Sequence, residues 1–141
     1  MVQGANYEDL RRRAASQIAS LDFDGVGIGG AIEKRIIGDT CAWICDAMPE
    51  NRPRHVLGIA SVDDIFACVE NGGDTFDCVG PARCARNGAI YTRAGRYNIK
   101  RAQHKFDFGP LEEGCDCYTC QHYSRAYVDH LLRAREFNGF T

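Results

Sequence analysis

Hydrophobic positions along the first 80 residues repeat with two different periods. In three stretches, apolar side chains recur every three or four positions, which predicts amphipathic helices over residues 7–21, 39–48 and 61–72. Between them lie short apolar runs bounded by glycine or proline, which predict strands over residues 23–30, 54–59 and 75–79. Strands that alternate with helices through short connections favour a parallel sheet with helices against it.

Local signals mark where these helices begin and end. Asn6 is suited to cap the first helix, and Ser61 with Asp64 forms a capping-box pattern at the start of the third. Pro49 ends the second helix. The fold class is therefore α/β, and three such units form an open sheet or part of a closed barrel. The unpaired apolar edge of so small a sheet predicts a fragment or one piece of an assembly.

The pattern changes after residue 79. Residues 89–92 and 96–99 are joined by a short turn that contains Gly95, which predicts a β-hairpin. A cysteine-rich segment follows, and a helix is predicted from His122 to Phe137. We therefore expect two parts: strand–helix units with an active-site strand over residues 1–88, and a hairpin, cysteine-rich segment and helix over residues 89–141.

The composition adds few constraints. The chain has 141 residues, of which 45% are hydrophobic and 26% are charged, as is typical of a globular domain. No apolar run approaches the ~20 residues that a membrane span needs, and no secretory signal opens the chain. We therefore expect a soluble, cytoplasmic protein with no membrane partner.

Positive charge is concentrated in one segment, although the net charge is −2. Between residues 83 and 105 there is no Asp or Glu, and there are seven basic residues: Arg83, Arg86, Arg93, Arg96, Lys100, Arg101 and Lys105. Such a segment suits a phosphate backbone, but it is equally typical of a solvated loop. Charge alone does not separate these two interpretations.

The eight cysteines fall into two groups. Five are scattered among apolar stretches and are expected to be small buried side chains, whereas Cys115, Cys117 and Cys120 lie within six residues. Without a secretory signal, three neighbouring thiolates favour a tetrahedral zinc site over disulfides. A redox role lacks the usual helix-start context after a thioredoxin-like strand. The fourth ligand is open, and the candidates are His122, His130, Cys84 and His104.

Asp77 lies near the C-terminal end of the third predicted strand, where parallel α/β proteins place their active groups. A carboxylate within an apolar strand is costly unless it is used or paired, so Asp77 is either catalytic or bonded to neighbouring amides. Gly29 and Gly30 permit a ligand to approach the backbone closely, although such pairs are common in turns. These patterns favour a site without identifying its reaction.

Several motifs occur together in an order that resembles a known family. The second half of the chain carries Phe76-Asp-Cys-Val79, Pro81, Arg83, Ala85-Arg-Asn-Gly88, Gly109-Pro-Leu111, Cys115-Asp-Cys-Tyr-Thr-Cys120 and Tyr123-Ser-Arg-Ala-Tyr127. The first half carries Val2-Gln-Gly4, Phe23-Asp-Gly25, Ile28-Gly-Gly30 and Pro53-Arg54. Together they span essentially the whole chain, which resembles the bacterial queuine-type tRNA-guanine transglycosylases.

The resemblance implies a fold and a reaction. The fold is a partial (β/α)8 TIM barrel with an inserted zinc-binding subdomain. The reaction replaces guanine at the tRNA wobble position by a 7-deazaguanine, in bacteria the aminomethyl precursor of queuosine. Asp77 would be the nucleophile that forms a covalent intermediate with the ribose.

The resemblance also implies binding residues. The base, flipped from its stack, would be contacted by Gln3, Gly29 and Gly30. RNA phosphates would be held by Arg83 and Arg86. A structural Zn²⁺ would be bound by Cys115, Cys117 and Cys120.

The chain departs from the family pattern at four points. The family's barrel begins before Gln3, and two aspartates that act on the base precede it. The family's fourth zinc ligand is a histidine that falls beyond Thr141, as does the helical tail that completes its members. After Gly30 this chain reads Ala31-Ile-Glu-Lys34 where many members have Leu, and Glu33 stands near the place of a base-sensing glutamate. The alternatives are a non-catalytic zinc-binding fragment that interacts with RNA, or one half of a split enzyme. The expected partners are tRNA, the guanine or 7-deazaguanine base, and a complementary chain or a second copy in a homodimer.

Overall fold

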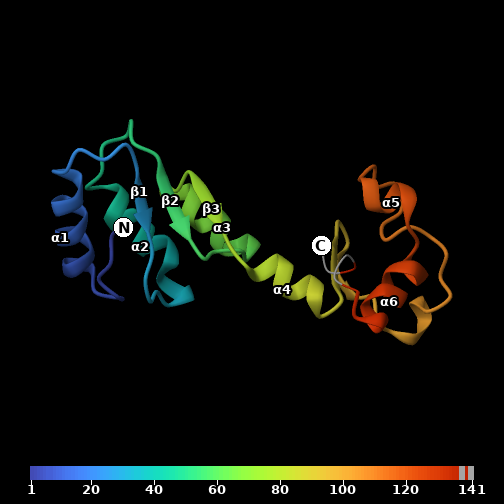
Figure 1. Cartoon of the computed structure of the whole chain (residues 1–141). Coiled ribbons are helices and arrows are strands. Elements are labelled where there is room, and N and C mark those ends of the chain that lie inside the picture. Colours follow the sequence, from blue (N-terminus) through green and yellow to red (C-terminus); the bar gives the residue numbers. More distant parts are fainter. Residues whose placement is uncertain (137–138, 140–141) are drawn as a thin grey trace. The chain divides into compact units, whose positions relative to one another are not determined.

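The structure of the chain is a computed structural model that describes residues 1–136 and residue 139. Its contacts group the chain into two compact units, Met1–Gly80 and Pro81–Thr141, and Figure 1 shows the elements of both. The division expected at residue 88 differs from this grouping by one short helix, and the roles given to its two parts stay predictions. Within the described residues, no helix has the length and apolar character needed to cross a membrane.

The first unit alternates helices and strands, as the sequence predicts. Its elements are α1 (Glu8–Ala19), β1 (Val26–Ile28), the 3-10 helix η1 (Lys34–Ile36), α2 (Ile37–Cys45), β2 (Arg54–Leu57), α3 (Val62–Glu70) and β3 (Thr75–Asp77). The strands are parallel in the order β1-β2-β3, and Val2 adds a parallel bridge to Ile28. The predicted parallel α/β arrangement is confirmed, although each strand is shorter than predicted.

The two faces of this sheet differ in burial. One face supplies buried apolar side chains to the core shared with the helices: Val26, Ile28 and Val56. The alternate strand positions are half-buried or exposed: Gly27, His55, Leu57, Thr75 and Asp77. Parallel sheets are ordinarily buried on both faces. In this unit the second face is open, so polar side chains lie on it without losing contact with solvent.

The helix caps differ from those predicted. The residue before α1 is Tyr7, and the Asn6 side chain instead bridges to a distant loop. Asn6 Nδ2 donates to Glu33 Oε1 at 2.8 Å, and Asn6 Oδ1 accepts from the Glu33 N–H at 3.0 Å. Ser61 is the N-cap residue of α3, but its side chain makes no capping hydrogen bond. The Asn6 prediction is wrong because the amide is engaged by Glu33.

The second unit contains a hairpin and short helices. Its elements are α4 (Gly80–Arg86, which begins at the last residue of the first unit), β4 (Ala89–Thr92), β5 (Gly95–Asn98), the 3-10 helix η2 (Ala102–His104), α5 (Tyr118–His122) and α6 (Arg125–Ala134). The antiparallel pairing of β4 and β5 confirms the predicted hairpin. The helix predicted from His122 is confirmed by α6, but it begins three residues later, because the Ser124 side chain accepts from the Tyr127 N–H at 3.2 Å and caps its first turn. Its predicted end at Phe137 lies outside the described residues.

Charged side chains tie the loops of the second unit to α6. Asp107 accepts from the Gly109 N–H at 3.0 Å and from Arg125 Nη1 at 3.0 Å, and these bonds lower the pKa of the Asp107 carboxyl. The Arg133 Nε donates to the buried Asp129 at 2.7 Å. The chain leading to the cysteine cluster is therefore held against α6 by polar contacts.

We predict that Thr40→Val stabilises the chain. Thr40 lies in α2 with 0% of its surface exposed, and its hydroxyl has no hydrogen-bond partner among the described residues. Valine keeps the branched shape and removes the unpaired hydroxyl, so the free energy of unfolding should rise by about 1 kcal/mol. Urea denaturation measures the change, and an unchanged or lower midpoint would contradict the prediction.

Candidate active site and metal centre

The parallel register places the ends of four chain segments in one row. Neighbouring registered positions in the sheet are Val2, Ile28, Val56 and Phe76. The residues that directly follow them are Gln3, Gly29, Leu57 and Asp77. We call these four residues the carboxyl-edge row. This edge is where parallel α/β proteins place their active groups, and three of the predicted site residues belong to it.

Asp77 ends β3 on the open face of the sheet. Its side chain is 63% exposed, and its Oδ1 lies 3.1 Å from His55 Nε2. The desolvation cost that drew attention to Asp77 in the sequence therefore does not arise. Its position in the carboxyl-edge row and its contact with His55 are what distinguish this carboxylate.

Close packing surrounds the glycine pair. A Cβ atom at Gly29 would lie 2.7 Å from Met1 Sδ and 3.0 Å from Leu57 Cδ1. Gly30 has φ +92°, a backbone conformation that favours glycine. A Cβ atom at this position would lie 3.5 Å from the Cγ of Gln3. The structure thus brings Gln3, Gly29 and Gly30 together. The positive φ favours glycine at position 30, and at position 29 a Cβ atom would displace the ends of the Met1 and Leu57 side chains.

A cavity of about 430 Å³ opens beside the carboxyl-edge row. Its walls include Gly30, Leu57 and Gly58. Lys34 and Asp64, whose charged groups lie 3.7 Å apart, also line it. A small concave site with both apolar and polar walls suits a small-molecule ligand. Because Leu57 is paired with Asp77 in the sheet, this cavity is near the carboxylate.

Arg11, in helix α1, holds the backbone around the carboxyl-edge row by hydrogen bonds. It is fully buried in α1, and its guanidinium donates three hydrogen bonds to backbone carbonyls. Nε bonds the Ala5 carbonyl at 2.8 Å, and Nη1 bonds those of Val2 at 3.1 Å and Gly29 at 2.7 Å. One side chain therefore connects the segment before Gln3 to the segment before Gly30.

Arg83 and Arg86 lie three residues apart in α4 and both side chains are exposed. The other five basic residues of the 83–105 segment are also exposed. Within the described part of the chain, none of the seven forms a salt bridge. Their charge is therefore available to an anionic partner, and the solvated-loop interpretation agrees equally with this geometry.

The clustered cysteines converge at the start of α5. The Sγ atoms of Cys115, Cys117 and Cys120 all lie within 4.8 Å of one another. The backbone N–H of Cys120 lowers the pKa of the Cys117 thiol, whereas burial raises the pKa of the Cys120 thiol. Three converging sulfurs, one of them favoured as thiolate, fit the donor set of a tetrahedral metal site.

The structure brings none of the candidate fourth ligands to this cluster. Among the described residues, no further His, Cys, Asp or Glu joins the three cysteines. His122 stacks on Tyr118 with ring centroids 4.3 Å apart, and its Nδ1 lies 2.9 Å from the Tyr118 carbonyl oxygen. His104 is buried against Tyr97, and the Cys84 thiol accepts from the Tyr91 hydroxyl at 3.5 Å.

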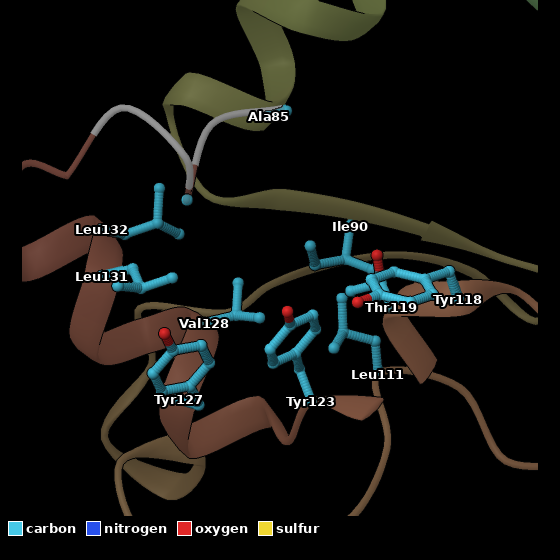
Figure 2. A pocket seen from close by; sticks show the side chains of 11 residues that line it. Ala85, Ile90, Leu111, Tyr118, Thr119, Tyr123, Tyr127, Val128, Leu131 and Leu132 are labelled. Atoms are coloured by element: carbon cyan, nitrogen blue, oxygen red, sulfur yellow. The ribbon is translucent and has the colours of Figure 1, made fainter. Parts of the chain in front are cut away.

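An apolar pocket of about 470 Å³ lies in the second unit (Figure 2). Figure 2 shows Val128 and Leu131 on one side of it, Ile90 and Leu111 on the other, and the Tyr123 ring between them. Its lining is mostly aliphatic and aromatic, without a converging set of charged groups. The candidate catalytic site therefore stays with the carboxyl-edge row.

Comparison with known proteins identifies the family. A family model described as queuine tRNA-ribosyltransferase matches residues 1–141. The chain belongs to this family. It is 46% identical to the queuine tRNA-ribosyltransferase of Desulforudis audaxviator, in a match that covers 99% of this chain and 38% of that protein. It is 45% identical to the queuine tRNA-ribosyltransferase of Lysinibacillus sphaericus, over 99% of this chain and 37% of that protein.

The family assignment confirms the resemblance seen in the motifs. It covers the whole chain, but the chain spans only 38% and 37% of the length of these two relatives. The described residues form a three-stranded parallel sheet with one added bridge and a two-stranded hairpin, and no closed barrel. The family is therefore established for this chain, whereas the barrel and the activity belong to the proposals below.

Sequence reasoning missed two residues that contact the row of this queuine tRNA-ribosyltransferase family member. Arg11 lies one helical turn before the buried Ala15, so its position in α1 faces the core. A basic residue at a core-facing position was the signal in the sequence that could have identified Arg11. His55 stands two residues before Leu57 in β2, on the same face. Its partner Asp77 is 22 residues away, and only the strand register reveals that contact.

We predict that Arg11→Met destabilises the chain by roughly 2–4 kcal/mol, because two buried carbonyls and one half-buried carbonyl lose their side-chain donor. Urea denaturation measures the loss. Arg13→Met is the matched control, since Arg13 is exposed on the same helix and should change stability by less than about 0.5 kcal/mol. Equal effects of the two substitutions would contradict the bracing role.

Proposed function

We propose that this chain carries the nucleophile and part of the base-binding site of a tRNA-guanine transglycosylase. The observation that supports this most directly is the carboxyl-edge row, in which Gln3, Gly29 and Asp77 follow registered neighbours on adjacent strands. An exposed carboxylate beside a small cavity suits attack on a sugar carbon. Family membership supplies the reaction class.

In the proposed reaction, Asp77 displaces guanine from the wobble nucleotide. One carboxylate oxygen bonds to the ribose C1′, and the glycosidic bond breaks with its electron pair going to the departing guanine. The incoming 7-deazaguanine then attacks C1′ and releases the carboxylate. Two successive displacements retain the configuration at C1′. The resemblance assigns the accompanying action on the base to two aspartates that precede Gln3 in the family.

Base recognition is proposed for Gln3, Gly29 and Gly30. The Gly29 carbonyl is already bonded to Arg11, which leaves the Gln3 amide and the backbone N–H of Gly30 as groups suited to a base edge. Extrusion of the target nucleotide from its stack would allow its edge to reach these groups. Glu33 is engaged by Asn6 and by Arg35 Nε at 2.6 Å, so we propose no base contact for it.

We propose tRNA as the macromolecular partner, with Arg83 and Arg86 contacting phosphates. Their exposure and the lack of acidic residues between positions 83 and 105 support this role. A cytoplasmic location agrees with such a substrate and stays a prediction.

We propose Zn²⁺ as the metal held by Cys115, Cys117 and Cys120. Zinc bound there would connect the loop before α5 to its first turn and would act structurally, since thiolate-rich closed sites hold folds together. Among the residues that the structure describes, no side chain joins the three cysteines as a fourth ligand.

A complete site requires further strands. The open sheet face supports a (β/α)8 barrel that is completed by additional chain, by a complementary chain or by a second copy. The competing function is a non-catalytic, zinc-binding module that contacts RNA. It shares the exposed basic segment and the cysteine cluster, but it gives Asp77 no role.

We predict that Asp77→Asn lowers incorporation of radiolabelled guanine into unmodified tRNA by at least about 10³-fold, since the amide is a poor nucleophile. The side chain is largely exposed, so the denaturation midpoint should be unchanged. Asp63→Asn, an exposed position with the same change of charge, is the control and should keep incorporation. Equal incorporation by Asp77→Asn would remove Asp77 from its role. No incorporation by an assembly in which the further strands complete the unmodified chain would favour the non-catalytic module.

We predict that Cys117→Ser lowers bound zinc and thermal stability together, because a serine oxygen is a weaker zinc ligand than a thiolate. Zinc content by elemental analysis and the unfolding temperature are measured on the same preparation. Cys84→Ser is the matched control, since its thiol lies outside the cluster. Full zinc content in the Cys117 variant would refute the site.

A further inference from the structure

His55 lies on the open sheet face between two polar neighbours. It is registered opposite Thr75, while Leu57, two residues later, is registered opposite Asp77. Its Nδ1 lies 2.8 Å from Thr75 Oγ1, and its Nε2 lies 3.1 Å from Asp77 Oδ1. Both ring nitrogens are therefore engaged, which fixes the orientation of the ring.

The chemistry of the partners gives the direction of these bonds. An ionised carboxylate only accepts hydrogen bonds, so the Nε2 of His55 must carry the hydrogen that it shares with Asp77. The Thr75 hydroxyl either donates to a neutral ring or accepts from a charged one. In both cases His55 donates to Oδ1. Within residues 1–80, the other oxygen, Oδ2, has no hydrogen-bond partner.

We propose that His55, oriented by Thr75, is a positioning residue that holds Asp77 Oδ1 and presents Oδ2 to the ribose. This rests on the proposed role of Asp77. Oδ2 bonds to C1′ as the glycosidic bond breaks, and the bonding electrons leave with guanine. Oδ1 becomes the carbonyl oxygen of the ester and keeps its hydrogen bond from Nε2. The incoming base later bonds to C1′ as the Oδ2–C1′ bond breaks, and the electron pair of that bond returns to Oδ2.

The exposure of the pair argues against a role in stability. The His55 side chain is 39% exposed and that of Asp77 is 63% exposed. Pairs that are this solvated contribute little to folding. Replacement of His55 should therefore leave the unfolding temperature unchanged, and a specific defect in the reaction would report on the orientation of the carboxylate.

A spectroscopic test needs no catalytic activity. Long-range ¹⁵N–¹H NMR of the ¹⁵N-histidine-labelled full chain reports which ring nitrogen of His55 carries hydrogen, and His55→Gln assigns the signal. We expect hydrogen on Nε2 in the unmodified chain and in the Thr40→Val control. In Thr75→Val the Asp77 carboxylate still accepts from Nε2, so the hydrogen should stay on Nε2 while the Nδ1 signal shifts because its hydrogen-bond partner is lost. An unprotonated Nε2 in the unmodified chain, or an unchanged Nδ1 signal in Thr75→Val, would overturn the proposal.

Exchange kinetics provide the second test. His55→Phe should lower kcat for guanine exchange about 10²-fold with little change in KM for tRNA or base, because a misaimed nucleophile slows the chemical step. His55→Gln retains a terminal N–H donor and should recover at least tenfold of that loss. An unchanged kcat in His55→Phe, or equal defects in both variants, would refute the positioning role. Failure of the proposed function has a different signature, since Asp77→Asn would then exchange as fast as the unmodified chain.

Discussion

The parallel register of the first unit is the constraint on which the site depends. Because Val2, Ile28, Val56 and Phe76 are registered neighbours, the next residue of each segment reaches the same edge of the sheet. A shift of one residue in any strand would exchange its buried and open faces and remove its side chain from the row. The apolar core thus sets the geometry of the carboxyl-edge row, since burial of alternate residues selects the register.

The face of the sheet that does not pack against the helices has a different role. Without neighbours to cover it, the face that bears His55, Thr75 and Asp77 keeps its polar side chains in solvent. Arg11 acts from the helix side and occupies backbone carbonyls beside Gln3 and Gly30. The unit therefore combines a hydrogen-bonded backbone with an open polar surface, which agrees with the proposed site that further strands complete.

Much of this architecture could be predicted from the sequence, because hydrophobic periodicity is a local signal. The three strands, their helices and the β4–β5 hairpin follow from it. Asp77, Gly29 and the three clustered cysteines were also recognisable from residue type and spacing. Contacts made at long range were not, since Asn6 looks like a helix cap until Glu33 is seen beside it. The Ser124 cap that separates α5 from α6 is local, but it lies within an otherwise continuous helical pattern and was missed for that reason.

The most direct test of the central claim, that Asp77 is the reacting carboxylate of this row, is to locate the covalent bond. The chain is incubated with an unmodified tRNA anticodon stem-loop, denatured and digested, and the RNA-linked peptide is identified by mass spectrometry. The account predicts one adduct, on the peptide that contains Asp77, and its loss in Asp77→Asn. An adduct that maps to another residue, or that persists in the Asn variant, would contradict the account.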